Sequence, residues 1–297
     1  MKPMLADVLQ VLQLERLELN LFRGESRDPG HHRVFGGQVL GQALMAASAT
    51  VEPEREPAGK QRIVHSLHAY FLRAGDPDHP IIYEVDRSRD GSSFTSRRVV
   101  AIQHGAQIFH LSASFHRPEA GADRQGGMPQ VPGPEQLPDM AVAVEEMKRR
   151  APHRPRPFVL SDLPFEFRIA EFPDPEAEIP VQPSMKMWFK TVDRLPDEEV
   201  LHRGLLAYAS DYYLLLTAVL GEQLKVGPRH LQLASIDHAM WFHRPVRVDQ
   251  WLLYVLDSPT AVSSRGFARG SIFSRDGILV ASTAQEGLLR RRPPPVE

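Results

Sequence analysis

The second half of this 297-residue chain repeats the first half at a fixed spacing. Phe71 and Phe242 are 242 − 71 = 171 positions apart. The same spacing joins six further identical pairs: Arg73 and Arg244, Tyr83 and Tyr254, Asp86 and Asp257, Ser93 and Ser264, Arg98 and Arg269, and Ala113 and Ala284. Internal self-similarity of this kind indicates a duplicated structural unit. The chain is therefore predicted to fold as two copies of one unit.

Each copy combines an apolar helix with a series of strands. The first helix begins at Gly36-Gly37 and is apolar on nearly all sides, which is typical of a buried helix; the second covers 204–220. Asp276-Gly277 predicts a hairpin turn between the last two strands. Further helices are predicted at 4–13 and 140–150, and strands at 15–23, 63–72, 81–89, 94–103, 107–117, 164–172, 185–192, 231–242, 251–258, 263–275 and 279–289.

An apolar helix followed by a meander of strands is most stable when the sheet wraps the helix. We therefore predict an α+β fold in which two such units pair through their edge strands and form one continuous antiparallel sheet, which hides both edges. Prolines at eight positions between 118 and 157 interrupt any sheet there. The predicted division is a first unit at 1–117, a proline-rich linker with a short helix at 118–157, and a second unit at 158–297.

Composition excludes several functions. The net charge of −2 provides no general attraction to nucleic acid or to a membrane surface. The absence of cysteine excludes disulfides, thiolate catalysis and cysteine-bound zinc. No segment approaches the roughly 18 apolar residues of a membrane span, and the N-terminus lacks the apolar core of a signal peptide. The expected location is cytoplasmic.

Three polar residues stand out in apolar surroundings. Asp211 interrupts an apolar helix, where a carboxylate is costly unless it is hydrogen-bonded or protonated; alternatively, Ser210 or Asp211 caps a helix that starts at Tyr212. Ser235 is a hydroxyl in an apolar strand, and its counterpart in the first half is Val64 (235 − 171 = 64). Gln285 lies in the last strand, where its amide could orient a water molecule, although strand glutamines often simply face solvent.

The histidines do not predict a metal site. His65 and His68 are three residues apart, so in a regular strand they point to opposite faces and cannot chelate one ion. No cofactor is expected. The chain also lacks the Gly-x-Ser-x-Gly turn of serine hydrolases and the phosphate-binding loop of nucleotide-binding proteins.

Longer motifs carry a family resemblance. RVFGGQVLGQAL (33–44), VHSLHAYFLRAGD (64–76), RDGSSFTSRRVVAIQ (89–103), YASD (208–211), IDHAMWFHRP (236–245) and ASTAQEG (281–287) resemble the type II acyl-CoA thioesterases, a family with a double hotdog fold. The similarity runs from about residue 5 to 290 and is weakest in the proline-rich linker. It implies an acyl-CoA substrate and a homodimer or homotetramer. The net charge already indicates that neither nucleic acid nor a membrane is a partner.

The resemblance also implies roles for particular residues. The family's catalytic aspartate, hydroxyl and glutamine fall on Asp211, Ser235 and Gln285. In the implied mechanism these groups activate water for attack on the thioester carbonyl. First-half residues are expected to line the substrate cavity: Gly36, Gly37, His65 and Tyr70. His65 is also a second candidate for the base, after Asp211. Two alternatives remain at this point, a hotdog enoyl-CoA hydratase that would use an Asp–His pair and a non-catalytic acyl-CoA-binding module.

Overall fold

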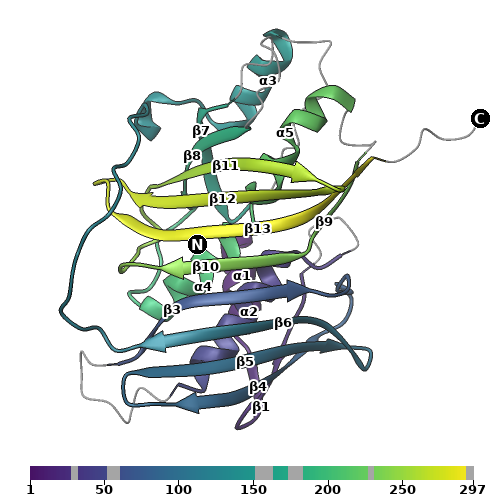
Figure 1. Ribbon diagram of the computed structural model, residues 1–297, viewed down its shortest axis with the longest axis vertical. Coiled ribbons are helices and arrows are strands. Elements are labelled where there is room, and N and C mark those ends of the chain that lie inside the picture. The colour runs from purple at the N-terminus through teal and green to yellow at the C-terminus, as the bar shows by residue number, and fades with distance from the viewer. Residues whose placement is uncertain (28–32, 52–60, 151–162, 173–182, 227–230, 292–297) are drawn as a thin grey trace, which may run out of the picture.

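The computed structural model describes residues 1–27, 33–51, 61–150, 163–172, 183–226 and 231–291. Its strands form a single 13-stranded sheet (Figure 1), and the strand pairs within it are antiparallel. Helices α1, α2 and α4 lie behind the central strands in this view. This arrangement confirms the predicted continuous sheet with helices against it.

The first half supplies two helices and six strands. Helix α2 has few polar residues and packs on β5 and β6, as a buried central helix should. The bounds are α1 (Pro3–Leu12), β1 (Glu15–Glu18), β2 (Leu21–Gly24), α2 (Gly36–Ala49), β3 (Ile63–Phe71), β4 (Ile81–Asp90), β5 (Phe94–Gln103) and β6 (Ala106–His116).

The second half follows a 3-10 turn, η2 (Pro134–Gln136), and helix α3 (Met140–Arg150). Its elements are β7 (Phe165–Glu171), β8 (Ser184–Thr191), α4 (Glu199–Ser210), α5 (Leu214–Val226), β9 (Leu231–Ser235), β10 (Asp237–Phe242), β11 (Leu252–Val262), β12 (Arg265–Ser274) and β13 (Leu279–Arg291). Helix α5 packs on β11, β12 and β13.

The strand order reads as a mirror image about its centre: β1-β2-β4-β5-β6-β3 continues as β10-β13-β12-β11-β8-β7. Strands β3 and β10 pair antiparallel at this centre, with His68 opposite Ala239. Since 239 − 68 = 171, this pair maps onto itself under the sequence repeat. A local two-fold axis therefore passes between these two residues and relates the two halves.

The repeat also holds for single side chains in the core. Tyr83 and Tyr254 are both fully buried, and each donates its hydroxyl hydrogen to a helix. Tyr83 bonds Gln42 Oε1 on α2 at 2.7 Å, and Tyr254 bonds the backbone oxygen of Ser210 on α4 at 2.9 Å. The hydroxyl of an otherwise apolar side chain thus fixes helix to sheet in both halves, which satisfies buried polar groups that would otherwise cost stability.

Three predicted elements are each divided in two. The strand predicted at 15–23 is the hairpin β1–β2, and the one at 231–242 is interrupted at Ile236 between β9 and β10. The helix predicted at 204–220 was wrong as a single element, because α4 ends at Ser210 and α5 begins at Leu214. Tyr213 between them has φ 63°, a left-handed conformation that a continuing helix does not allow. Apolar runs alone do not reveal such breaks.

The proline-rich segment packs on the outer face of the second half. Met128, Val131 and Leu137 pack against a small cluster centred on Trp188. The Trp188 indole donates to the backbone oxygen of Pro132 at 2.9 Å. These contacts attach the segment to the sheet, while helix α3 forms with the predicted bounds. The predicted boundaries of the proline-rich linker, at residues 118 and 157, stay a prediction.

Candidate active site

Asp211 occupies the break between α4 and α5. It is the C-cap of α4, and its side chain is only 7% exposed. The alternative in which Ser210 or Asp211 caps a helix that starts at Tyr212 was wrong, because Asp211 caps the end of α4 and the next helix, α5, begins at Leu214. A carboxylate at such a point needs hydrogen-bond donors from outside its own helix.

Gln285 links Asp211 to Ser235. From the helix-facing side of β13, its Nε2 donates to Asp211 Oδ1 at 2.8 Å and to Ser235 Oγ at 3.1 Å. The reverse orientation of the amide would place its oxygen against the carboxylate, so this orientation is the favourable one. Because Ser235 Oγ accepts from Gln285, its own hydroxyl hydrogen remains available to a bound molecule. The structure thus brings the three predicted polar residues together.

The start of α2 closes the other side of Asp211. The backbone N–H of Gly37 donates to the carboxylate, and a Cβ on Gly36 would lie 2.7 Å from Asp211 Oδ2. A Cβ on Gly37 would lie 2.3 Å from the backbone oxygen of Tyr208. Neither position has room for a side chain, so the two glycines let the helix end approach the carboxylate. The positive end of a helix dipole stabilises a negative charge there.

Burial and hydrogen bonding act on the Asp211 carboxyl in opposite directions. Burial raises its pKa, the bonds from Gln285 and from the Gly37 N–H lower it, and the net shift is upward. The low-polarity surroundings include three aromatic rings. The Phe35 ring stacks on that of Tyr212 with their centroids 4.6 Å apart, and it meets the Tyr208 ring edge-on with their centroids 5.2 Å apart. A carboxylate with a raised pKa is a stronger base than an ordinary aspartate, which suits proton abstraction from water.

His238 is a fourth polar residue of the site, and the sequence analysis assigned it no role. Its ring is fully buried, with Nε2 2.9 Å from Ser210 Oγ and Nδ1 3.9 Å from Asp211 Oδ1. Burial lowers the pKa of His238 to about 3, so the imidazole is neutral at ordinary pH. In a regular strand Ser235 and His238 would face opposite sides, but the interruption at Ile236 turns both toward the helices.

The structure does not bring His65 and Tyr70 into this group. His65 Nε2 lies 2.8 Å from Ser114 Oγ, and the ring meets Phe94 edge-on. Tyr70 is 50% exposed, and its ring lies 5.6 Å from that of His110. Among the contacts of the described residues, none joins either side chain to Asp211, Ser235 or Gln285. Their place in the substrate cavity stays a prediction.

Comparison with known proteins identifies the family. A model for the acyl-CoA thioesterase family matches residues 177–288, and one for the acyl-CoA thioesterase N-terminal domain matches residues 25–116. An acyl-CoA thioesterase 2 from Haemophilus influenzae is 40% identical over 98% of this chain and 99% of its own length. The chain belongs to the acyl-CoA thioesterase family.

Further relatives agree with this assignment. The human acyl-coenzyme A thioesterase 8 is 38% identical over 96% of this chain and 89% of its own length. The crystal structure of an acyl-CoA thioesterase II from Mycobacterium marinum, 40% identical, superposes with a TM-score of 0.78 and covers 96% of this chain and 98% of that one. A protein with a hot dog fold from Alicyclobacillus acidocaldarius, 18% identical, superposes with a TM-score of 0.72 over 97% of this chain and 99% of its own, which supports the fold alone.

The predicted family and the double hotdog fold are thereby confirmed. Membership makes the chain a thioester hydrolase, as predicted, and leaves the hydratase and the non-catalytic binding module without support. None of the helices described in the structure is both long and apolar enough to cross a membrane.

Proposed function

We propose that the chain hydrolyses the thioester of fatty acyl-CoA with a water molecule activated by Asp211, Ser235 and Gln285. The observation that carries this proposal is the double hydrogen bond of Gln285, which holds a buried carboxylate and a hydroxyl at 2.8 Å and 3.1 Å from one amide nitrogen. A base and a hydroxyl fixed in this way can position one water between them.

In the first step, Asp211 takes a proton from the water as its oxygen attacks the thioester carbonyl carbon. The raised pKa of Asp211 makes this transfer more favourable than it would be for an exposed aspartate. Ser235, whose Oγ accepts from Gln285, orients the water through its free hydroxyl hydrogen. Among the described residues, no histidine contacts Ser235 as the base of a serine nucleophile would, so no covalent acyl-serine is required.

The attack places negative charge on the former carbonyl oxygen. The positive end of the α2 helix dipole lies beside Asp211 and can supply this stabilisation. The tetrahedral intermediate then collapses, the carbon–sulfur bond breaks, and the CoA thiolate recovers the proton held by Asp211. The products are the free fatty acid and CoA.

Each chain holds one such centre in this proposal. The first-half counterpart of Gln285 is Ser114, which bonds His65 instead of a carboxylate, and the counterpart of Ser235 is Val64. Fusion of two units thus left the reacting groups on one copy, while the other copy contributes the start of α2 through Gly36 and Gly37.

A homodimer or homotetramer in the cytoplasm completes the proposal. The outward side of the central strands carries Tyr70, 50% exposed, and Trp241, whose ring meets His68 edge-on at 5.2 Å. Exposed aromatic side chains on a sheet face favour contact with a second copy. Light scattering coupled to size-exclusion chromatography measures the assembly directly, and a monomer at micromolar concentration would contradict this part.

The test of the catalytic proposal is Asp211→Asn, which keeps the shape of the side chain and removes the base. Hydrolysis of a series of acyl-CoA chain lengths, followed by CoA thiol release, should slow by about 10²- to 10⁴-fold. Asp257→Asn is the matched control, because Asp257 pairs with Arg269 on β12 far from the helix-facing side and should leave turnover near that of the native chain. Full activity in a folded Asp211→Asn chain would refute the proposal.

A further inference from the structure

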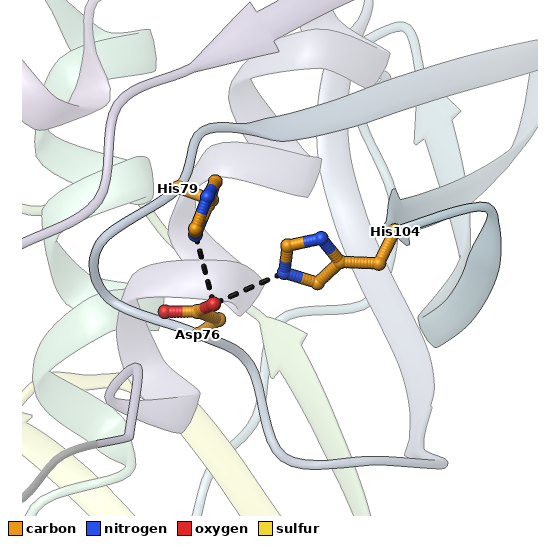
Figure 2. A group of neighbouring side chains, drawn as sticks. All are labelled: Asp76, His79 and His104. Atoms are coloured by element: carbon orange, nitrogen blue, oxygen red, sulfur yellow. Dashed lines mark hydrogen bonds and ion pairs between the residues drawn. The ribbon is translucent and has the colours of Figure 1, made fainter.

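Three side chains outside the active site converge on one point of the first half. Asp76 and His79 lie between β3 and β4, and His104 lies at the turn between β5 and β6 (Figure 2). Both rings point at the same carboxylate oxygen: His79 Nδ1 is 2.8 Å and His104 Nε2 is 3.0 Å from Asp76 Oδ2. One ligand atom from each residue lies within 4.8 Å of the other two.

From this geometry we propose that Asp76, His79 and His104 form a binding site for a divalent transition-metal ion of the Zn²⁺ type. Two imidazoles and one carboxylate form a ligand set that suits Zn²⁺ and related ions, and three protein ligands leave a further position for water. This inference concerns a different part of the chain and does not rest on the proposed hydrolase mechanism.

The loop that carries Asp76 and His79 is held in place by Gln103. This buried side chain accepts from the backbone N–H of Asp76 at 2.8 Å. Its Nε2 donates to the backbone oxygens of Asp76 at 2.9 Å and of His79 at 2.8 Å. Gln103 directly precedes His104, so one amide fixes the distance between the two segments that supply the ligands. Such support from neighbouring groups is what gives a metal site its geometry.

The Asp76 carboxylate is itself oriented. The backbone N–H of Asp78 donates to Asp76 Oδ1 at 3.0 Å, which leaves Oδ2 directed at the two rings. The local backbone thus fixes which carboxylate oxygen faces the two imidazole nitrogens.

The hairpin turn between β5 and β6 sets the direction of the His104 ring. His104 has φ 49° and Gly105 has φ 72°, the left-handed conformation that the favoured two-residue hairpin turns require. The resulting turn sets the His104 ring 4.6 Å from that of His79, at 73° to it.

Only small movements would admit an ion. Ligand atoms around a tetrahedral Zn²⁺ at about 2.0–2.1 Å are roughly 3.4 Å apart, somewhat more than the two distances to Asp76 Oδ2. The rings of His79 and His104 are 56% and 57% exposed and can shift outward by this amount. Each ring would then carry its proton on the nitrogen that faces solvent.

The second half does not reproduce the cluster. At the spacing of 171 residues the three positions hold Arg247, Gln250 and Arg275. Arg247 pairs with Asp249, and Arg275 with Glu135, and guanidinium groups repel a cation. The fold therefore does not require an Asp-His-His group at these turns. The group in the first half thus serves a purpose other than folding, which is consistent with ion binding.

The test is calorimetric titration of Zn²⁺ into the full chain, prepared without a histidine tag and stripped with a chelator, at pH 7.5. One ion per chain should bind, and binding should weaken by at least roughly tenfold in Asp76→Asn and in His104→Asn, since each loses one of three ligands. Asparagine tolerates the left-handed backbone, so His104→Asn should keep the turn intact. His68→Ala, which removes an exposed imidazole elsewhere, should bind Zn²⁺ as the native chain does.

Co²⁺ provides a second readout that does not depend on stability or activity. Bound Co²⁺ with few ligands absorbs visible light. This absorption band should appear in the native chain and in His68→Ala and be absent from Asp76→Asn. Absence of saturable Zn²⁺ binding by the native chain would overturn the proposal. Equal Zn²⁺ affinity in the native, Asp76→Asn and His104→Asn chains would also overturn it, because the ion would then bind at other histidines.

Discussion

The buried, neutral His238 should make the stability of the protein depend on pH. Its pKa is about 3 in the folded chain, against an ordinary value of 6.5. Below pH 6.5 the unfolded chain therefore binds a proton at this residue that the folded chain does not, so stability falls as the pH falls. From pH 7.0 to pH 5.5 this linkage lowers the free energy of unfolding by about 1.3 kcal/mol.

The comparison that isolates this effect is the native chain against His238→Gln, which removes the titration and keeps a donor for Ser210. Urea unfolding followed by circular dichroism at pH 7.0 and 5.5, at one protomer concentration, gives the two free energies. The fall in stability should be smaller in His238→Gln by about 1.3 kcal/mol. Asp211, whose raised pKa acts in the opposite direction, is present in both proteins and cancels in the comparison.

His68→Gln is the control for the loss of a histidine as such, since His68 is exposed on β3. Coincident transitions by circular dichroism and tryptophan fluorescence would justify the two-state treatment. An identical fall in stability for the native chain and His238→Gln would refute the reasoning, because it would mean that the buried imidazole takes up its proton as readily as an exposed one.

Four further predictions concern the reaction. Ser235→Thr should keep turnover near the native value because the hydroxyl remains, whereas Ser235→Ala should lower it by roughly tenfold or more; both are measured by CoA thiol release. The double change Asp211→Asn with Gln285→Ala should cost much less than the product of the single changes, since the two residues act on one water; multiplicative losses would contradict a shared role. Gly36→Ala should reduce kcat because its Cβ would displace Asp211 Oδ2, while Gly133→Ala, with its nearest neighbour at 3.5 Å, should not. As the pH is lowered, kcat/KM should fall with an apparent pKa above the ordinary aspartate value of 3.8, because the base must be ionised and the pKa of Asp211 is raised.

The sheet was predictable from the sequence because alternation and turn residues act locally. The strand predicted at 94–103 has the observed bounds of β5, and the position of β12 follows from the repeat, since 94 + 171 = 265 and 103 + 171 = 274. The three central site residues were also identifiable, because a carboxylate, a hydroxyl and an amide in apolar segments need partners, and they find them in one another.

What the sequence did not reveal depends on contacts between distant segments. The break at Ile236 is set by pairing across the sheet, where the Ile236 N–H donates to Glu286 and Asp237 Oδ1 accepts from the Glu286 N–H. Without that break, His238 would face away from Ser235. The convergence of His79 with His104 likewise depends on how two turns meet, which no spacing along the chain records.

The pairing of β3 with β10 across the local two-fold axis has a consequence for how the enzyme gains its activity during folding. It joins segments separated by about 170 residues, and contacts of such long range form late because the loop-closure entropy must be overcome first. Asp211 belongs to one half, and the glycine N–H that it accepts from belongs to the other. With Asp211 as the proposed base, each half can therefore acquire its own helix and strands and still be inactive. Recovery of thioesterase activity on refolding reports the docking of the two halves, and it should lag behind the recovery of secondary structure.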